Sequence, residues 1–175
     1  SRSEIITQMI YGETFKIINK SKKWIKIKIK EDRYIGYIKK KKFIPYLKPT
    51  HKVSTLFANI YKNANFKNKI KKIPYASKIK IDNLGKKFSK FQNSWVESKN
   101  IKSITYRNKN IFKDIKIFKG VKYKWGGKTF RGIDCSALIQ VCLNFNNKFC
   151  PRDSSQQVKY FKNNINLKKI KKNDI

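Results

Sequence analysis

The sequence of 175 residues carries 44 lysine and arginine residues against 10 aspartate and glutamate residues, and 39% of it is hydrophobic. That apolar content is enough for one or more packed cores, which excludes a wholly disordered chain, and no apolar run approaches the length of a membrane span. Three cysteines without metal-ligand spacing and a single histidine argue against a structural zinc site, so we expect neither a metal nor another cofactor.

The formal net charge of +34 would ordinarily indicate a nucleic-acid-binding protein. Only five of the basic residues are arginines, however, and the lysines are spread along the chain among many Asn, Ile, Phe and Tyr residues. This usage is typical of an AT-rich coding sequence, so base composition explains the charge without a selected basic surface. We therefore expect no specific nucleic-acid partner, although such a surface would still attract polyanions in a salt-dependent way.

Residues 1–48 are predicted to form short strands. Residues 24–30 alternate apolar and charged side chains with a period of two, Glu31 and Asp32 make a turn, and residues 34–38 resume a strand. Residues 15–18 add another strand after Gly12. Short strands separated by turns suggest a small barrel, and the order of these elements resembles the bacterial Src-homology-3 barrel.

Residues 50–106 offer a second and weaker set of strands. The apolar runs lie at residues 56–61, 70–74, 79–81 and 94–96, after a boundary at Pro49. We interpret them as a second barrel-like domain that repeats the first. Residues 107–175 form the third predicted domain, which begins with a basic connector and a short helix at residues 111–118.

Within the third domain, residues 123–157 place a cysteine where a helix should begin. Gly126, Gly127 and Gly132 mark a loop, Asp134 is a good N-cap, and apolar residues then recur at helical spacing. Cys135 therefore lies in the first helical turn, where unpaired amide groups and the helix dipole favour the reactive thiolate. A small apolar residue packed under the helix is the alternative, since free cysteines are usually buried.

The same segment resembles the NlpC/P60 family of bacterial cell-wall cysteine peptidases. That family has a tyrosine, a WGG turn, a DCSG motif and a PRDS motif followed by glutamine. This sequence has them in order, at Tyr123, residues 125–127, residues 134–136 and residues 151–154. Ala137 stands where the family usually has the glycine that ends the DCSG motif. The resemblance implies a papain-like α+β peptidase domain of which these residues are the N-terminal part.

The resemblance also implies roles for single residues. Cys135 would attack an amide carbonyl and form an acyl-enzyme, and Tyr123 would steady the oxyanion or the substrate. The implied substrate is a murein stem peptide, cleaved after γ-D-glutamate, with a free N-terminal L-alanine bound by Asp134 and Ser136. The implied substrate groove further includes Trp125, Arg152, Asp153 and Ser154.

Structural alternatives to these roles stay open at this point. A tyrosine such as Tyr123 can be buried with a purely structural hydrogen bond, and Asp134 can act only as a helix cap. Asp153 or Ser154 can cap the next helix, with Arg152 on the surface.

The position of the histidine is the main difficulty for a peptidase. In the NlpC/P60 family the histidine follows the cysteine in the chain, whereas His51, the one histidine here, precedes Cys135 by a long way. Acid–base assistance is typically worth about 10²–10⁴-fold in rate. We therefore expect this sequence to be a fragment, truncated at the C-terminus and also at the N-terminus, with little activity alone.

The sequence as a whole thus predicts an α+β chain of two small Src-homology-3-like barrels followed by the first part of a papain-like domain. The leading functional hypothesis is a cysteine endopeptidase acting on murein peptides. A module that binds peptidoglycan without cleaving it and a lysine-rich nucleic-acid binder are the alternatives. Three cysteines that we read as reduced thiols favour the bacterial cytoplasm over the periplasm or secretion; the oligomeric state is left open.

Overall fold

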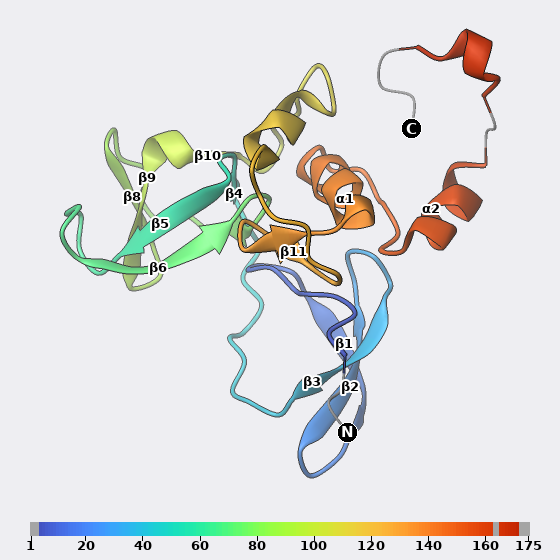
Figure 1. Cartoon of the computed structure of the whole chain (residues 1–175). Helices are drawn as coiled ribbons and strands as arrows, with labels where there is room; N and C mark the ends of the chain where they lie inside the picture. The colour runs from blue at the N-terminus through green and yellow to red at the C-terminus, as the bar shows by residue number, and fades with distance from the viewer. Residues whose placement is uncertain (1–3, 163–164, 172–175) are drawn as a thin grey trace.

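The computed structural model describes residues 4–162 and 165–171 (Figure 1). Its N-terminal sheet has the order β1-β2-β3 and consists of β1 (Phe15–Lys20), β2 (Trp24–Ile29) and β3 (Ile35–Lys39), all antiparallel. The alternation predicted for β2 is confirmed, because Ile25, Ile27 and Ile29 form a small buried core while the lysines between them face outward. The turn predicted at Glu31 and Asp32 is present between β2 and β3.

The middle of the chain forms two further antiparallel sheets. One has the order β10-β4-β7, and the other has the order β6-β5-β9-β8. The strands are β4 (His51–Val53), β5 (Phe57–Tyr61), β6 (Lys69–Pro74), β7 (Lys78–Ile79), β8 (Phe88–Phe91), β9 (Ser94–Glu97) and β10 (Ile101–Ser103), with the short 3-10 helix η1 (Ser98–Asn100) before β10. The ladders are linear among the described residues, so a closed barrel in either segment stays a prediction.

The C-terminal third carries the helices. The predicted short helix of the connector is the 3-10 helix η2 (Lys113–Phe118), and the hairpin of β11 (Lys128–Thr129) and β12 (Gly132–Ile133) follows it. Helix α1 (Cys135–Phe145), helix α2 (Ser154–Phe161) and the 3-10 helix η3 (Leu167–Lys169) complete the order. Small antiparallel sheets with a few helices make this an α+β fold, as predicted.

One hydrophobic core joins all three parts of the chain. It contains Ile10 from the N-terminal segment, Tyr75 and Ala76 from the middle segment, and Ile133, Ala137, Val141 and Phe145 around α1. The ring of Tyr75 stacks on that of Phe145 with 4.7 Å between centroids. In Figure 1, α1 accordingly lies beside the middle sheets and above the N-terminal sheet, next to the β11 hairpin. The three segments therefore pack as one body around α1, which carries the cysteine at its first residue.

Residues 4–162 and 165–171 contain no helix with the length and apolar character needed to cross a membrane.

Candidate active site

Cys135 is the first residue of α1, as the sequence predicts. Asp134 caps this helix, since its carboxylate accepts a hydrogen bond of 2.8 Å from the Ala137 N–H. The Cys135 side chain is exposed, in contrast to Cys142 and Cys150, which are both fully buried. The alternative of an apolar cysteine packed under the helix therefore does not describe Cys135. An exposed thiol at a capped helix N-terminus has the geometry of a nucleophile.

Tyr123 and Trp125 lie on the loop that precedes the helix. Tyr123 pairs its backbone with that of Ile133 in a parallel bridge, two residues before Cys135. Both aromatic side chains are largely exposed, with 66% of Tyr123 and 63% of Trp125 accessible. A buried structural role for Tyr123 is thus not observed, and its predicted catalytic role stays a prediction.

A buried ionic network surrounds the residues on either side of Cys135. Arg152 donates from Nη1 to Asp134 Oδ1 at 3.0 Å and from Nη2 to Asp134 Oδ2 at 2.5 Å, and Nη1 also reaches Ser136 Oγ at 2.9 Å. Only 1% of Arg152 is accessible, so the alternative of a surface arginine is wrong. Ser136 in turn donates to Asp134 Oδ1 at 3.1 Å, and the Gly126 N–H donates to Oδ2 at 3.0 Å.

The carboxylate of Asp134 is therefore saturated. A carboxylate offers about four lone-pair sites, and that of Asp134 already accepts hydrogen bonds from two side chains and two backbone amides. Burial by itself raises the pKa of Asp134, but the bonds from Arg152 and the Ala137 amide outweigh burial and lower it below its usual value. In this arrangement Asp134 and Ser136 hold the helix N-terminus in place, and their predicted contact with a substrate amine stays a prediction.

Asp153 and Ser154 begin the second helix. Asp153 occupies the N-cap position of α2 without a side-chain capping bond, and Ser154 is exposed. The carboxylate of Asp153 interacts with Tyr34, the residue before β3, through a side-chain hydrogen bond and through its charge. Burial, followed by the negative charge of Asp153, raises the pKa of Tyr34.

Tyr34 and Asp153 line an open groove of about 1000 Å³ between the N-terminal sheet and α2. Its walls also include Asp32, Pro151 and Gln156. Cys135 does not line this groove, but Pro151 and Asp153 flank Arg152, which bonds the residues on either side of the cysteine. The groove therefore runs up to the network that holds the nucleophile.

Sequence reasoning missed several residues that hold this site together. Gln157 donates to the carbonyl oxygens of Ser136 at 2.9 Å and Pro151 at 3.0 Å, and so ties α2 to the first turn of α1. It was visible only as the glutamine after the PRDS motif. Tyr34 carried no signal, because a tyrosine near a strand is common. Lys128, whose buried ammonium pairs with Glu13, carried none either, because it is one lysine among many.

His51 lies away from the nucleophile. It sits in β4, and the adjacent Lys52 is fully buried and donates to the carbonyl oxygens of Tyr106, at 2.6 Å, and Phe145. Phe145 is the last residue of α1, so β4 is anchored at the end of the helix opposite Cys135. A helix of 11 residues is about 16 Å long. His51 is therefore not the base for Cys135, as its place in the chain predicts.

The three thiols provide a direct test of this geometry. We expect iodoacetamide to label one cysteine per native molecule at neutral pH and three after denaturation, with Cys135 as the native site. Cys142 and Cys150 are inaccessible, and burial raises the pKa of each to about 12. Peptide mapping by mass spectrometry identifies the labelled residue, and equal native labelling of Cys135 and Cys142 would contradict the structure.

The lowered pKa of Asp134 predicts a dependence of stability on acid. A carboxyl with a depressed pKa in the folded state contributes stability that is present above its unfolded pKa, about 3.9, and is lost as pH falls through its folded pKa. Urea unfolding between pH 7 and pH 3 should therefore show a loss of stability on acidification that is smaller in Asp134→Asn. Identical pH profiles of the two proteins would remove Asp134 as a source of that stability.

Two family models match the chain. Residues 1–43 match the model of the bacterial dipeptidyl-peptidase Sh3 domain, and residues 120–175 match the model of the NlpC/P60 family. No curated protein sequence matches the chain.

Two solved structures were compared with this fold. A crystal structure of an NlpC/P60 family protein from Bacillus cereus superposes with a TM-score of 0.80 at 20% identity, over 95% of this chain and 63% of that protein. The structure of NlpC2 from Trichomonas vaginalis gives a TM-score of 0.38 at 18% identity, over 90% of this chain and 63% of that protein. This chain thus spans less than two thirds of the length of either protein.

At 20% identity the Bacillus cereus structure supports only the fold of this chain, whereas the family models compare its sequence. The match to the NlpC/P60 model agrees with the motifs around Cys135. Residues 120–175 are therefore similar to the NlpC/P60 family, and residues 1–43 are similar to the bacterial Sh3 type.

Proposed function

We propose that the protein containing this chain is a cysteine endopeptidase that hydrolyses murein stem peptides after γ-D-glutamate. The observation that carries the proposal is the exposed thiol of Cys135 at the capped N-terminus of α1, within a segment of the NlpC/P60 family. The three free thiols favour a reducing compartment, so we place this activity in the bacterial cytoplasm.

The proposed reaction is acyl transfer through a thioester. The Sγ atom of Cys135 attacks the carbonyl carbon of the γ-glutamyl amide, and the C–N bond breaks as the proton given up by the thiol goes to the leaving amine. Water then hydrolyses the thioester to a carboxylic acid and restores the thiol. Amide groups of the first helical turn can stabilise the oxyanion that forms on the attacked carbonyl, and Tyr123 lies on the adjacent loop as a further hydroxyl donor. The proton carrier is not His51, which is anchored at the far end of α1.

The groove beside α2 supports recognition of a short peptide with a free amino terminus. Asp153 presents there a carboxylate that makes no capping bond to α2 and is hydrogen-bonded with Tyr34 of the Sh3-type segment. An ammonium group would pair with that carboxylate, whereas Asp134 has no free lone pair to offer. Because the Sh3-type segment forms one wall, the groove favours short stem peptides over intact, cross-linked peptidoglycan.

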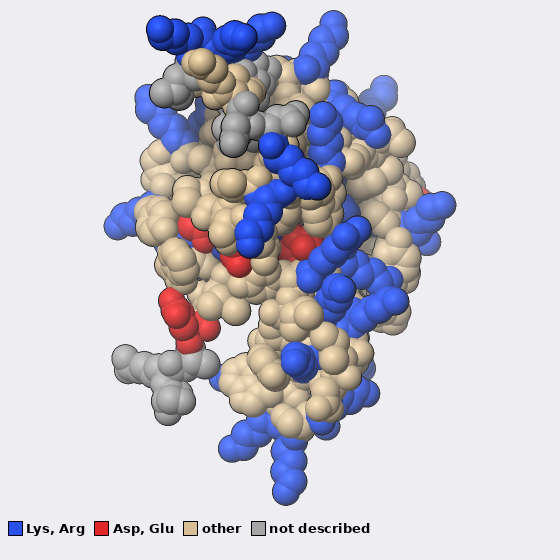
Figure 2. All heavy atoms as spheres, turned by 90° about the vertical axis from the view of Figure 1, so that its right-hand side faces the viewer, with Lys and Arg blue, Asp and Glu red and all other residues tan. Residues whose placement is uncertain are grey.

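A module that binds peptidoglycan without cleaving it is the second candidate. The match of residues 1–43 to the bacterial Sh3 model is the observation that favours it. A nucleic-acid binder has less support. On the face shown in Figure 2, lysine and arginine side chains project over several elements and do not gather in one patch.

A peptide assay separates these candidates. The native protein is incubated with L-Ala-γ-D-Glu-meso-diaminopimelate and with the same peptide acetylated at its amino terminus, and products are identified by mass spectrometry. We expect release of L-Ala-γ-D-Glu from the free peptide and much slower release from the acetylated one. Retention on peptidoglycan without release from either peptide would contradict the peptidase and support the binding module.

A further inference from the structure

We propose that residues 5–13, together with Asp32, are a positioning element for Cys135, acting through Lys128. We call residues 5–13 the strap. This inference rests on the proposed function, because it assigns the Sh3-type segment a part in holding the nucleophile. The segment would then be a component of the catalytic unit rather than a separable wall-binding domain.

The strap contacts the nucleophile's loop and the arginine behind it. A Cβ atom on Gly126 would lie 2.1 Å from the Ile5 carbonyl oxygen, so the two backbones touch at a position that only glycine allows. Gln8 Oε1 accepts the Lys128 N–H at 3.0 Å, and Thr7 Oγ1 accepts from Arg152 Nε at 2.9 Å. Three successive contacts thus fix the strap to both sides of the site.

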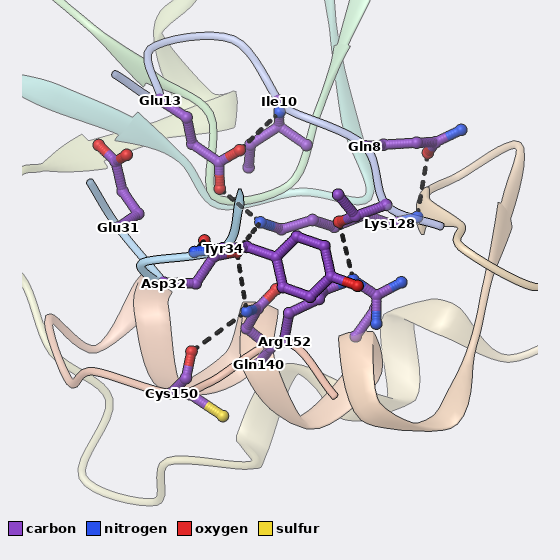
Figure 3. Close-up of polar contacts among 12 residues, drawn as sticks. Gln8, Ile10, Glu13, Glu31, Asp32, Tyr34, Lys128, Gln140, Cys150 and Arg152 are labelled. Atoms are coloured by element: carbon purple, nitrogen blue, oxygen red, sulfur yellow. Dashed lines mark hydrogen bonds and ion pairs between the residues drawn. The ribbon is translucent and has the colours of Figure 1, made fainter. Parts of the chain in front are cut away.

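A buried charge cluster completes the attachment (Figure 3). The Lys128 ammonium lies 2.5 Å from Glu13 Oε1 and 3.8 Å from Asp32 Oδ2, and the side chains of Lys128 and Asp32 have no accessible surface. Gln140, in the middle of α1, donates to Asp32 Oδ2 at 3.2 Å and to the Cys150 carbonyl oxygen at 3.1 Å. Burial raises the pKa of Glu13 despite the nearby ammonium. One cation therefore neutralises carboxylates from two places in the Sh3-type segment.

The cluster is connected to Cys135 by a short and rigid path. Lys128 lies in β11 and pairs with Ile133 of β12, and the next residue is Asp134, the cap of α1. Ile10 of the strap packs in the same core as Ile133 and Ala137. Movement of Lys128 would therefore shift the hairpin that sets the direction in which the chain enters the helix. Displacement of a reacting group by about 1 Å can cost about 10²-fold in rate.

The test uses a cycle of three variants, namely Lys128→Met, Glu13→Gln and the double variant. Lys128→Met leaves two buried carboxylates without a cation, whereas the double variant removes one of those charges again. Glu13→Gln alone keeps Lys128 beside Asp32 and is the milder change if Lys128→Met fails to fold. Lys99→Met is the matched control, because 79% of the Lys99 side chain is accessible, although its partner Glu97 is only 10% accessible.

The readout is the rate of Cys135 alkylation relative to the unmodified protein, with Cys142 and Cys150 as internal markers of folding. We expect a fall of about tenfold for Lys128→Met, a smaller fall for Glu13→Gln, partial recovery in the double variant, and protected buried thiols throughout. In the peptide assay kcat should follow the same order while KM changes little.

Two outcomes would overturn the inference. One is an unchanged rate of Cys135 alkylation in both Glu13→Gln and Lys128→Met while the buried thiols stay protected. The other is a joint rise in labelling of all three thiols, without recovery in the double variant, which would show a global structural role only. Because each rate is a ratio to the unmodified protein, absence of peptide hydrolysis would count against the proposed function and leave this test intact.

Discussion

Replacement of Arg152 by methionine should lower the free energy of unfolding by about 3–5 kcal/mol, because it leaves the buried Asp134 carboxylate without its cation. The guanidinium makes a two-pronged pair with Asp134 and also bonds Ser136 and Thr7, at 1% exposure. Chemical unfolding followed by tryptophan fluorescence or circular dichroism measures the loss. A domain of ordinary stability has only about 5–15 kcal/mol in total, so the variant would be severely weakened.

Arg152→Lys and Lys99→Met provide the comparison for that experiment. Lysine keeps the charge but cannot reproduce the planar fork, so Arg152→Lys should fall between the native protein and Arg152→Met. Lys99, which is largely exposed, pairs with Glu97 at 3.2 Å, and the replacement of this exposed lysine should cost less than about 1 kcal/mol. A cost below about 1 kcal/mol for Arg152→Met would mean that the buried network does not stabilise the fold.

Replacement of Cys135 by serine should reduce hydrolysis of the γ-glutamyl peptide by at least about 10⁴-fold, as removal of a nucleophile does in comparable hydrolases. The fold should be unaffected, because the side chain is exposed and Asp134 still caps the helix. Unfolding curves of the two proteins should therefore coincide. Cys142→Ala is the control. This thiol is buried on the inner face of α1, so its replacement should affect stability rather than turnover. Turnover by Cys135→Ser within tenfold of the native rate would exclude a cysteine nucleophile.

Much of the local structure could be predicted from sequence because it depends on local patterns. The alternation of isoleucine and lysine in β2 and the cap at Asp134 each require only a few neighbouring residues. The position of Cys135 in the first turn of α1 follows from the same cap and from the glycines before it. Such features are determined by backbone geometry and by a single apolar face.

The arrangement of the segments could not be predicted in the same way. The sequence suggested separate barrels, whereas Ile10, Tyr75 and Phe145 share one core around α1. A shared core depends on contacts between residues far apart in the chain, and the local spacing of apolar residues does not predict such contacts. The predicted boundaries near residues 49 and 107 therefore say little about how the three segments pack.

Buried charges were the least predictable feature of the candidate site. Lys52, Lys128 and Arg152 are each almost completely buried, although such residues are rarely buried without partners. In a chain so rich in lysine, nothing in the sequence distinguishes the few that have carboxylate or carbonyl partners. The sequence assigned both Arg152 and Asp134 to substrate binding, and it does not show that these two side chains bond one another.

The central claim is that Cys135 is the nucleophile. The most direct test is to measure the mass of the protein after turnover has been stopped with acid. The native protein is mixed with L-Ala-γ-D-Glu-meso-diaminopimelate, quenched within the first turnover, digested and mapped by tandem mass spectrometry. We predict an L-Ala-γ-D-Glu acyl group on Cys135 and on neither Cys142 nor Cys150. Hydrolysis of the peptide without any adduct on Cys135, in a protein whose Cys135→Ser variant remains active, would contradict the assignment of Cys135 as the nucleophile.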